Sequence, residues 1–119
     1  MVIVEEGDVV LEKRSVVRLK RPYEKVTKRQ QIELMVIGQG GLLGEESLNG
    51  EPYCFSCKIH SLKALVLIIN VKDIKLRFPN DMKSHIIEAF HEKQKFRQSL
   101  LSQRIEEQSQ ILTSKYEEN

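Results

Sequence analysis

The stretch "GQGGLLGEESLNGEPY", from Gly38 to Tyr53, holds five of the chain's six glycines. Glycines at this density interrupt regular structure, so the stretch is expected to be a loop between strands. Within it, a short helical turn is predicted at about Glu45 to Leu48. The N-terminus of such a turn presents free backbone N–H groups and a partial positive charge, which suit an anion. The alternative is that Glu45 and Glu46 occupy this position themselves and simply cap the turn.

Two familiar phosphate-binding loops do not fit the stretch. A Walker loop, G-x-x-x-x-G-K-[ST], fails because Gly44 is followed by Glu45 and no lysine is nearby. A dinucleotide fingerprint, G-x-G-x-x-G, fails because Gly38, Gly40 and Gly44 have a different spacing, and only a short segment follows before Gly50. The loop therefore has to be interpreted together with the segments around it.

Strands are predicted on both sides of the glycine-rich stretch. The first two are expected to form a hairpin with its turn at Gly7. The strongly charged segment Lys20 to Gln31, which contains Pro22, is expected to be an exposed loop between strands. The predicted strands are Val2–Val4, Val9–Lys13 with an extension over Ser15–Leu19, Ile32–Ile37, Tyr53–Ile59 and Leu62–Ile69.

Two of these strands carry predictions about burial. Tyr53 to Ile59 alternates apolar and polar residues, which is typical of a half-buried strand, and Cys57 is expected to be a small core residue. Leu62 to Ile69 is apolar enough to be buried on both faces.

The C-terminal third is predicted to be helical. A short helix is expected in "NVKDIKLRF" before Pro79, and Asn80 or Asp81 can cap a longer one, because no Gly or Pro follows. The apolar residues there form two stripes with a polar stretch between them, which predicts one helix docked on the sheet and a second that projects or folds back. The stripes are Met82, Ile86, Ala89 and Phe90, and then Leu101, Ile105, Gln108 and Leu112.

Composition limits the functions that the chain can have. A length of 119 residues with 40% apolar residues suits one modest core, and a net charge of +2 does not favour nucleic-acid binding. The longest apolar run, Ala64 to Ile69, is too short to span a membrane, and the first residues do not resemble a signal peptide. We therefore expect a soluble, intracellular protein with no membrane insertion and with reduced cysteines.

Motifs for metal binding and catalysis are weak. Cys54 and Cys57 form C-x-x-C, but the distance to His85 and His91 is too long for a zinc finger, and a strand would direct the two sulfurs to opposite faces. No nucleophile with a base and no acid–base pair stands out, and Glu45 is the only candidate carboxylate. We expect no metal site, no cofactor and no enzymatic activity.

The residues from "GQGGLLGEESLNGEPYCFSCK" to "LKALVLIINVKDIKLRFP" resemble the second half of a cyclic nucleotide-binding domain. In that family a β-roll carries a phosphate-binding cassette, F-G-E-x-[AS]-L, and after a variable loop P-R-x-x-[TS]-V. Leu43 to Leu48 matches the first part, and Pro52 to Cys57 matches the second. The resemblance implies an antiparallel, jelly-roll-like β-roll followed by one or two helices.

The resemblance also implies roles for individual residues. Gly44 would lend its backbone N–H, Glu45 would accept a hydrogen bond from the ribose 2'-hydroxyl, and the Ser47 backbone would face the cyclic phosphate. Cys54 would offer the phosphate another backbone N–H, and Ser56 would lie near the base. The implied set of cyclic-nucleotide-binding residues is Gly44, Glu45, Glu46, Ser47, Tyr53, Cys54 and Ser56.

The chain departs from the family pattern in its charge. The family's arginine, which pairs with the cyclic phosphate, is replaced by Tyr53. Loss of a charged hydrogen bond costs roughly 1.5 to 3 kcal/mol, and Glu45 and Glu46 would then face the phosphate uncompensated. Lys58 is not expected to replace this arginine, because it lies five residues along the strand from Tyr53 and on the opposite face.

The chain also lacks the helix and the two strands that open the family's domain, which leaves exposed sheet edges. A partner chain or a missing N-terminal segment is expected to complete the β-roll. The predicted organisation is a partial cyclic nucleotide-binding β-roll over 1–79 and a helical extension over 80–119.

The functional hypothesis is a non-catalytic regulatory or scaffolding module with weak or lost nucleotide binding, which acts through protein–protein contacts. The alternative is a working cAMP or cGMP sensor with the C-terminal helices as a lid. The expected compartment is the cytoplasm, and the analogy with the family adds the cilium or flagellum as an alternative. The predicted partner-binding side chains of the helix are Phe96, Leu100, Leu101, Ile105 and Leu112.

Overall fold

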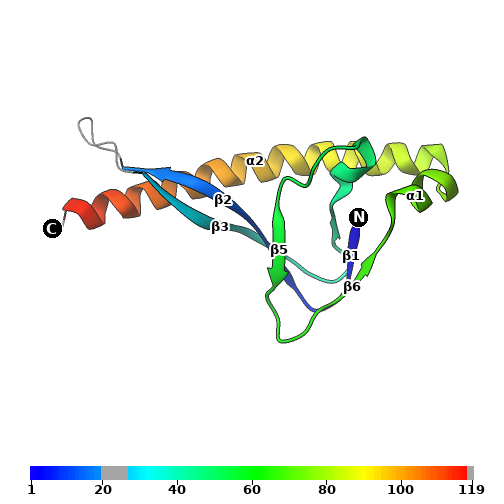
Figure 1. Ribbon diagram of the computed structural model, residues 1–119, viewed down its shortest axis with the longest axis horizontal. Coiled ribbons are helices and arrows are strands. Elements are labelled where there is room, and N and C mark those ends of the chain that lie inside the picture. Colours follow the sequence, from blue (N-terminus) through cyan, green and yellow to red (C-terminus); the bar gives the residue numbers. More distant parts are fainter. Residues whose placement is uncertain (20–26, 118–119) are drawn as a thin grey trace.

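The computed structural model describes residues 1–19 and 27–117, and it consists of two antiparallel three-stranded sheets beside one long helix (Figure 1). One sheet has the strand order β4-β1-β6 and the other β3-β2-β5. The strands are β1 (Val2–Glu6), β2 (Val9–Arg18), β3 (Thr27–Ile37), β4 (Leu42–Leu43), β5 (Ser56–Ile59) and β6 (Leu65–Ile68). The helices are the 3-10 turn η1 (Glu45–Asn49), α1 (Val71–Arg77) and α2 (Asn80–Glu117).

The predicted hairpin at Gly7 is wrong, because β1 and β2 belong to different sheets. The backbone at Gly7 has a φ of 77° and lies against the loop between β5 and β6, where an added Cβ would be 2.2 Å from the Lys63 carbonyl oxygen. The neighbouring Asp8 N–H donates to the Ser61 hydroxyl at 2.9 Å. The chain therefore turns from one sheet into the other at this corner.

The two-stranded ribbon of β2 and β3 is the longest pairing in the described structure. It runs from the pair Val9 and Ile37 to the pair Arg18 and Thr27, with an irregularity after Leu11. Residues 27–31, predicted as part of a loop, are strand because they pair with β2 along its second half. The rest of that predicted loop, residues 20–26, lies outside the described residues.

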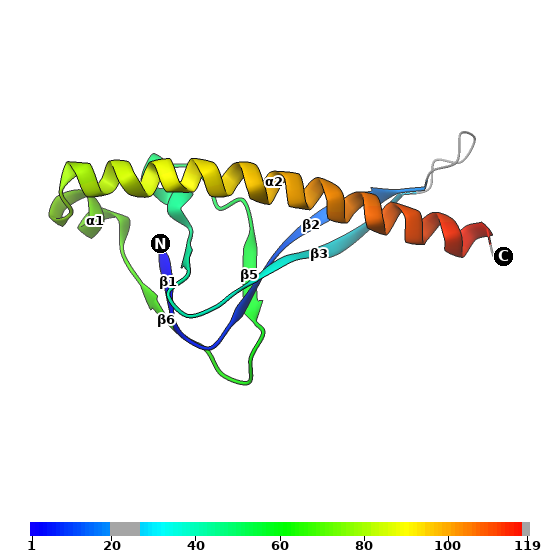
Figure 2. The same cartoon turned by 180° about the vertical axis from the view of Figure 1, so that it is seen from behind.

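The helix α2 is continuous over 38 residues, so the prediction of two separate helices is wrong. The polar stretch between the apolar stripes does not interrupt it, because this stretch contains neither Gly nor Pro. Both views place α2 along one side of the sheets, from α1 to the far end of the β2–β3 ribbon (Figures 1 and 2). The short helix α1 lies before Pro79 as predicted.

The main core lies between the sheets and α2. It joins Val17 of β2, Ile32 and Leu34 of β3, and Leu101 of α2, all of which are less than 8% exposed. A smaller cluster holds Met1, Leu48 and Ile74. The helix α2, which begins at Asn80, one of the two residues expected to cap it, shares the main core with the strands that precede it.

The strands β5 and β6 are exposed, which overturns the two predictions about their burial. In β6, which was expected to be buried on both faces, Leu65, Val66, Leu67 and Ile68 are 51%, 38%, 46% and 74% exposed. In β5 all residues are exposed, including Cys57, the predicted core residue. Each strand is the last in its sheet, so one side of each is not paired with another described strand.

The part of the chain that the structure describes contains no helix that is both long and apolar enough to cross a membrane.

Candidate functional site

The glycine-rich stretch forms the predicted helical turn, η1, which begins directly after Gly44. Gly44 has a φ of 76°, a conformation that L side chains rarely adopt. Its carbonyl oxygen accepts hydrogen bonds from the Ser47 hydroxyl at 2.6 Å and from the Ser47 N–H at 3.2 Å. The Ser47 N–H, which the resemblance implies would face a phosphate, is therefore engaged within the turn.

Beside this turn lies a cavity of about 620 Å³, a size typical of small-molecule sites. The expected cyclic-nucleotide-binding residues that line it are Gly44, Glu46, Tyr53, Cys54 and Ser56. The remaining lining residues are Val2, Leu11, Lys13, Arg14, Leu43, Phe55, Cys57, Ile68 and Arg97. The cavity therefore draws on both sheets, the glycine-rich loop and α2.

Gly44 and Tyr53 approach each other closely at one wall of the cavity. A Cβ added at Gly44 would be 2.8 Å from Cε1 of the Tyr53 ring, which is closer than carbon atoms pack. The Tyr53 side chain is 63% exposed. Tyr53 thus lies against the glycine-rich loop and is largely exposed on its outer side.

Glu46 faces the cavity but is already bonded within the chain. It is 3% exposed, and its Oε2 accepts a hydrogen bond from the Cys54 N–H at 3.3 Å. The Cys54 Sγ in turn accepts one from Gln94 Nε2 at 3.5 Å. The Cys54 N–H, implied to bind the phosphate, therefore holds the glycine-rich loop to the segment before β5.

Glu45 lies away from this cavity. Its side chain is 1% exposed, and Oε2 is 3.2 Å from the Lys93 Nζ of α2. It lines a separate cavity of about 430 Å³ with Met82, His85 and other α2 residues. The resemblance implies that Glu45 would bind the ribose. Its side chain instead forms an ion pair that joins η1 to α2.

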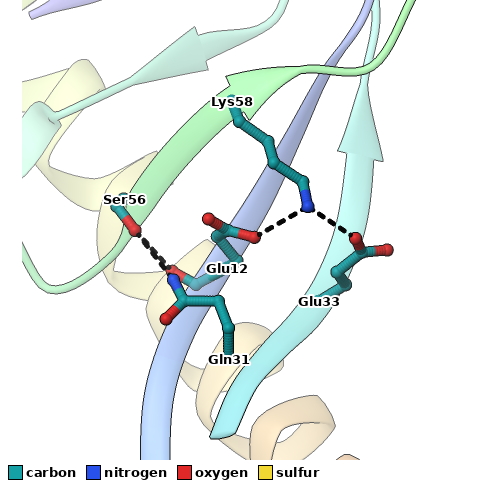
Figure 3. A network of polar contacts seen from close by, with 5 residues as sticks. All are labelled: Glu12, Gln31, Glu33, Ser56 and Lys58. Atoms are coloured by element: carbon teal, nitrogen blue, oxygen red, sulfur yellow. Dashed lines mark hydrogen bonds and ion pairs between the residues drawn. The ribbon is translucent and has the colours of Figure 1, made fainter.

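Ser56 is placed by a polar network on the outer face of the second sheet (Figure 3). Its hydroxyl donates to the Glu12 carbonyl oxygen at 3.4 Å and accepts from Gln31 Nε2 at 3.4 Å. Lys58 Nζ lies 3.0 Å from a Glu33 carboxylate oxygen and 3.4 Å from one of Glu12. The network joins β5 to β2 and β3. The Lys58 ammonium is paired within this sheet, and Lys58 does not line the cavity of about 620 Å³.

The hydrogen bond to Glu33 and then that to Glu12, followed by the charges of Glu12 and Glu33, raise the pKa of Lys58 above its ordinary value of 10.5. The ammonium form is the one that these two carboxylates stabilise.

Three cations of the cavity were missed by the sequence reasoning: Lys13, Arg14 and Arg97. Lys13 Nζ lies 5.5 Å from the centre of the Phe55 ring, a cation–π distance. Arg97 is only 5% exposed. A signal for Arg97 was present, because it falls seven residues after Phe90 and four before Leu101, on the face that α2 turns toward the core.

The predicted partner-binding residues of α2 are mostly engaged within the chain. Leu101 is buried in the main core, and Leu100, Ile105 and Leu112 pack against it. Phe96 is 59% exposed and is the member of the set that remains available. Leu101 is buried, and the other three are partly buried, because the β2–β3 ribbon lies along the second half of α2.

The two cysteines are free thiols, Cys54 partly buried and Cys57 exposed. Within the described ranges, no group of three or more His, Cys, Asp or Glu side chains could hold a metal ion. His60 Nδ1 lies 4.0 Å from an Asp8 carboxylate oxygen.

Comparisons with protein-family models, with curated proteins and with solved structures found no match to this chain.

Proposed function

We propose that this chain is a non-catalytic regulatory or scaffolding module, similar to a cyclic nucleotide-binding domain, that docks a segment of another polypeptide along β5 and β6. One observation carries the proposal: both strands are sheet edges, and β6 exposes apolar side chains on both of its faces. Exposed apolar edge strands are sites where a further strand pairs.

The geometry favours an occupant with two strands. One sheet ends at β5 and the other at β6, and a short loop over 60–64 joins these two edge strands (Figure 1). One added strand on each edge would give two four-stranded sheets, which is the number that the resemblance requires for a complete β-roll. The occupant is therefore expected to be an apolar, two-stranded segment.

The side chains of β6 define the chemistry of that segment. Leu65 and Leu67 project from one face, and Val66 and Ile68 project from the other, because side chains alternate along a strand. A pairing strand must place apolar side chains on both faces to cover them. An acidic residue beside β5 is not required, because Lys58, the cation of that strand, is already paired with Glu12 and Glu33.

Photo-crosslinking tests the docking surface directly. A photoreactive residue in place of Ile68 is expected to form one crosslinked adduct with the docked polypeptide. Mass spectrometry should map the crosslink to an extended apolar segment of that polypeptide. The same group at Gln103, an exposed position of α2, is the matched control and should give none. Leu67→Lys should remove the Ile68 adduct, and the isolated segment should protect β6 amides from hydrogen exchange.

Two results would count against the docking proposal. If Ile68 and Gln103 give the same adducts, the strand has no specific occupant. If the adduct joins two copies of this chain, the surface is a self-association interface.

A second candidate function is a cAMP or cGMP sensor in which α2 acts as a lid. It is favoured by the cavity, which gathers most of the implied nucleotide-binding residues and is bordered by α2. Calorimetric titration, together with the amide shifts of Gly44 to Ser47, tests it. Saturable binding at micromolar nucleotide would support the sensor and overturn the expectation of weak or lost binding.

Substitution of Tyr53 sharpens the same test. Tyr53→Arg restores the guanidinium of the family pattern at an exposed position, so it should strengthen nucleotide binding by about ten- to a hundred-fold if only the charge is lacking. Unchanged binding would mean that the loop geometry, and not the charge, limits affinity.

A further inference from the structure

The half of the β2–β3 ribbon that extends beyond β5 has one face toward α2 and one toward solvent. Val17 lies in the main core with Leu101, and Gln30 Nε2 donates to Gln108 Oε1 of α2 at 2.9 Å, so these side chains mark the inner face. Side chains alternate between the two faces along a strand, and residues paired across two strands share a face. The outer face therefore consists of Arg14, Val16 and Arg18 of β2 with their partners Gln31, Arg29 and Thr27 of β3.

This outer face, the arginine face, is positively charged. Arg14, Arg18 and Arg29 are all exposed, and their side chains form no ion pair or hydrogen bond in the described structure. No Asp or Glu occurs among residues 13–19 or 27–31. A concentrated positive surface is thus present on a chain whose net charge is only +2.

The acidic residues that continue this face toward β5 do not neutralise the arginines. Glu12 and Glu33 are a cross-strand pair, two positions before Arg14 along β2. Lys58 Nζ lies 3.4 Å from the Glu12 carboxylate and 3.0 Å from that of Glu33 (Figure 3). Both carboxylates are therefore paired with the cation of β5, and the arginine face is left without a counter-charge from its own sheet.

The three arginines recur at a regular interval along the ribbon. Arg29 is paired with Val16, which lies midway between Arg14 and Arg18 on β2. The arginine positions therefore follow one another at every second residue, about 6.8 Å apart at a strand rise of about 3.4 Å. An extended polypeptide places alternate side chains at the same interval. Acidic residues at every second position of such a segment would thus match the arginines in register.

The remaining side chains of the arginine face favour a polypeptide over a nucleic acid. Proteins that hold single-stranded nucleic acid combine cations with aromatic side chains on which the bases stack. The positions between the arginines are Val16, Thr27 and Gln31, and none is aromatic. Val16 is 44% exposed and offers an apolar contact, whereas Thr27 and Gln31 can hydrogen-bond to a peptide main chain.

We infer that the arginine face binds an extended acidic segment of another protein, with Asp or Glu at every second position. The carboxylates would lie opposite Arg14, Arg29 and Arg18 in turn, because a guanidinium can bind both oxygens of a carboxylate. This inference goes beyond the docking of an apolar segment along β5 and β6, since it concerns a different surface with a different chemistry.

An NMR titration of the ¹⁵N-labelled full chain with a synthetic peptide tests the inference. The peptide carries glutamate at three alternate positions with threonine between them, and its uncharged counterpart carries glutamine instead of glutamate. The acidic peptide is expected to bind with a Kd below about 1 mM at about 50 mM salt, and to shift the amides of residues 14–18 and 27–31. The glutamine peptide should shift none of them.

Arg29→Glu and Lys28→Glu are a matched pair of variants. Lys28 is also an exposed cation, but it pairs with Val17 and so belongs to the inner face. Arg29→Glu should weaken peptide binding about ten-fold, because it removes an ion pair and adds a repulsive carboxylate, whereas Lys28→Glu should weaken it less than about two-fold. Arg18→Gln and Arg29→Gln, each expected to weaken binding about two- to five-fold, provide the measurement if Arg29→Glu does not fold. Arg14 is left unchanged because it also lines the cavity beside the glycine-rich loop.

Four results would overturn the inference. The first is the absence of saturable shifts with the acidic peptide. The second is equal weakening by Arg29→Glu and Lys28→Glu, which would mean that the peptide responds to net charge and not to the arginine face. The third is equal binding of a peptide of the same composition with its three glutamates adjacent. The fourth is tighter binding of an oligothymidylate or of phosphatidylserine vesicles that Arg29→Glu abolishes, which would assign the face to nucleic acid or lipid.

Discussion

The β2–β3 ribbon and the edge strand β6 both carry apolar side chains, but only the ribbon buries several of them in the main core. Val17 and Leu34 of the ribbon are 0% and 3% exposed, whereas Leu67 and Ile68 of β6 are 46% and 74% exposed. The difference is the helix, since α2 lies along the ribbon and contributes Leu101 to its core. Whether the apolar side chains of a strand are buried thus depends on the elements that pack against that strand.

The largest expected effect on stability comes from substituting two leucines, one in each region. Leu34→Ala should lower the free energy of unfolding by about 2 to 5 kcal/mol, because it leaves a cavity in the main core. Leu67→Ala should cost less than about 1 kcal/mol, because its side chain already contacts solvent. Urea unfolding of both variants measures the difference. A loss at Leu67 as large as that at Leu34 would mean that β6 is covered in solution.

Two serines that donate to carbonyl oxygens give an intermediate effect. The Ser109 hydroxyl of α2 is buried and donates to the Arg18 carbonyl at the end of the ribbon, whereas the exposed Ser56 donates to that of Glu12. Ser109→Ala leaves a buried acceptor unpaired at a cost of roughly 1 to 3 kcal/mol, offset by about 0.5 kcal/mol of better helix propensity.

Ser56→Ala should stay within about 0.5 kcal/mol of wild type, because water replaces an exposed hydrogen bond. Thermal unfolding of the two variants compares them. Equal losses would contradict the assignment of α2 as the element that buries the ribbon.

The smallest expected effect concerns the ion pairs of Lys58, which bind the open strand β5 to the ribbon. Because the folded-state pKa of Lys58 is raised above 10.5, its contribution to stability is complete below that pH and is lost as the pH rises through the folded pKa. The difference in Tm between wild type and Lys58→Met should therefore shrink as the pH rises above 10.5. Other lysines titrate in both chains, so a difference that does not change with pH would rule out these pairs as its source.

The sequence allowed most elements of the fold to be located. The turn after Gly44, the short helix before Pro79 and the start of α2 at Asn80 were predicted from local signals: glycine, proline and capping residues. The hairpin at Gly7 was not, because that corner depends on the distant Ser61 and Lys63. The exposure of β6 was also unpredictable, since it depends on which elements are present to cover a strand.

The candidate site shows the same division between local and distant information. The cassette resemblance named the lining residues that lie close together in sequence, such as Gly44, Tyr53 and Cys54. It could not name Lys13 or Arg97, which reach the cavity from a strand and a helix far along the chain. It also placed Glu45 in the site, whereas the approach of Lys93 from α2 draws its carboxylate away.

The unbroken course of α2 gives the molecule the mechanics of a lever. Lys93 and Arg97 lie near its middle, beside the glycine-rich loop, and about 30 Å of helix extends from Arg97 to Glu117 at a rise of 1.5 Å per residue. A rotation of α2 by about 10° around that fulcrum would displace its C-terminal end by roughly 5 Å. Because Leu101 and Ser109 hold this half of α2 to the β2–β3 ribbon, such a rotation would carry the ribbon with it.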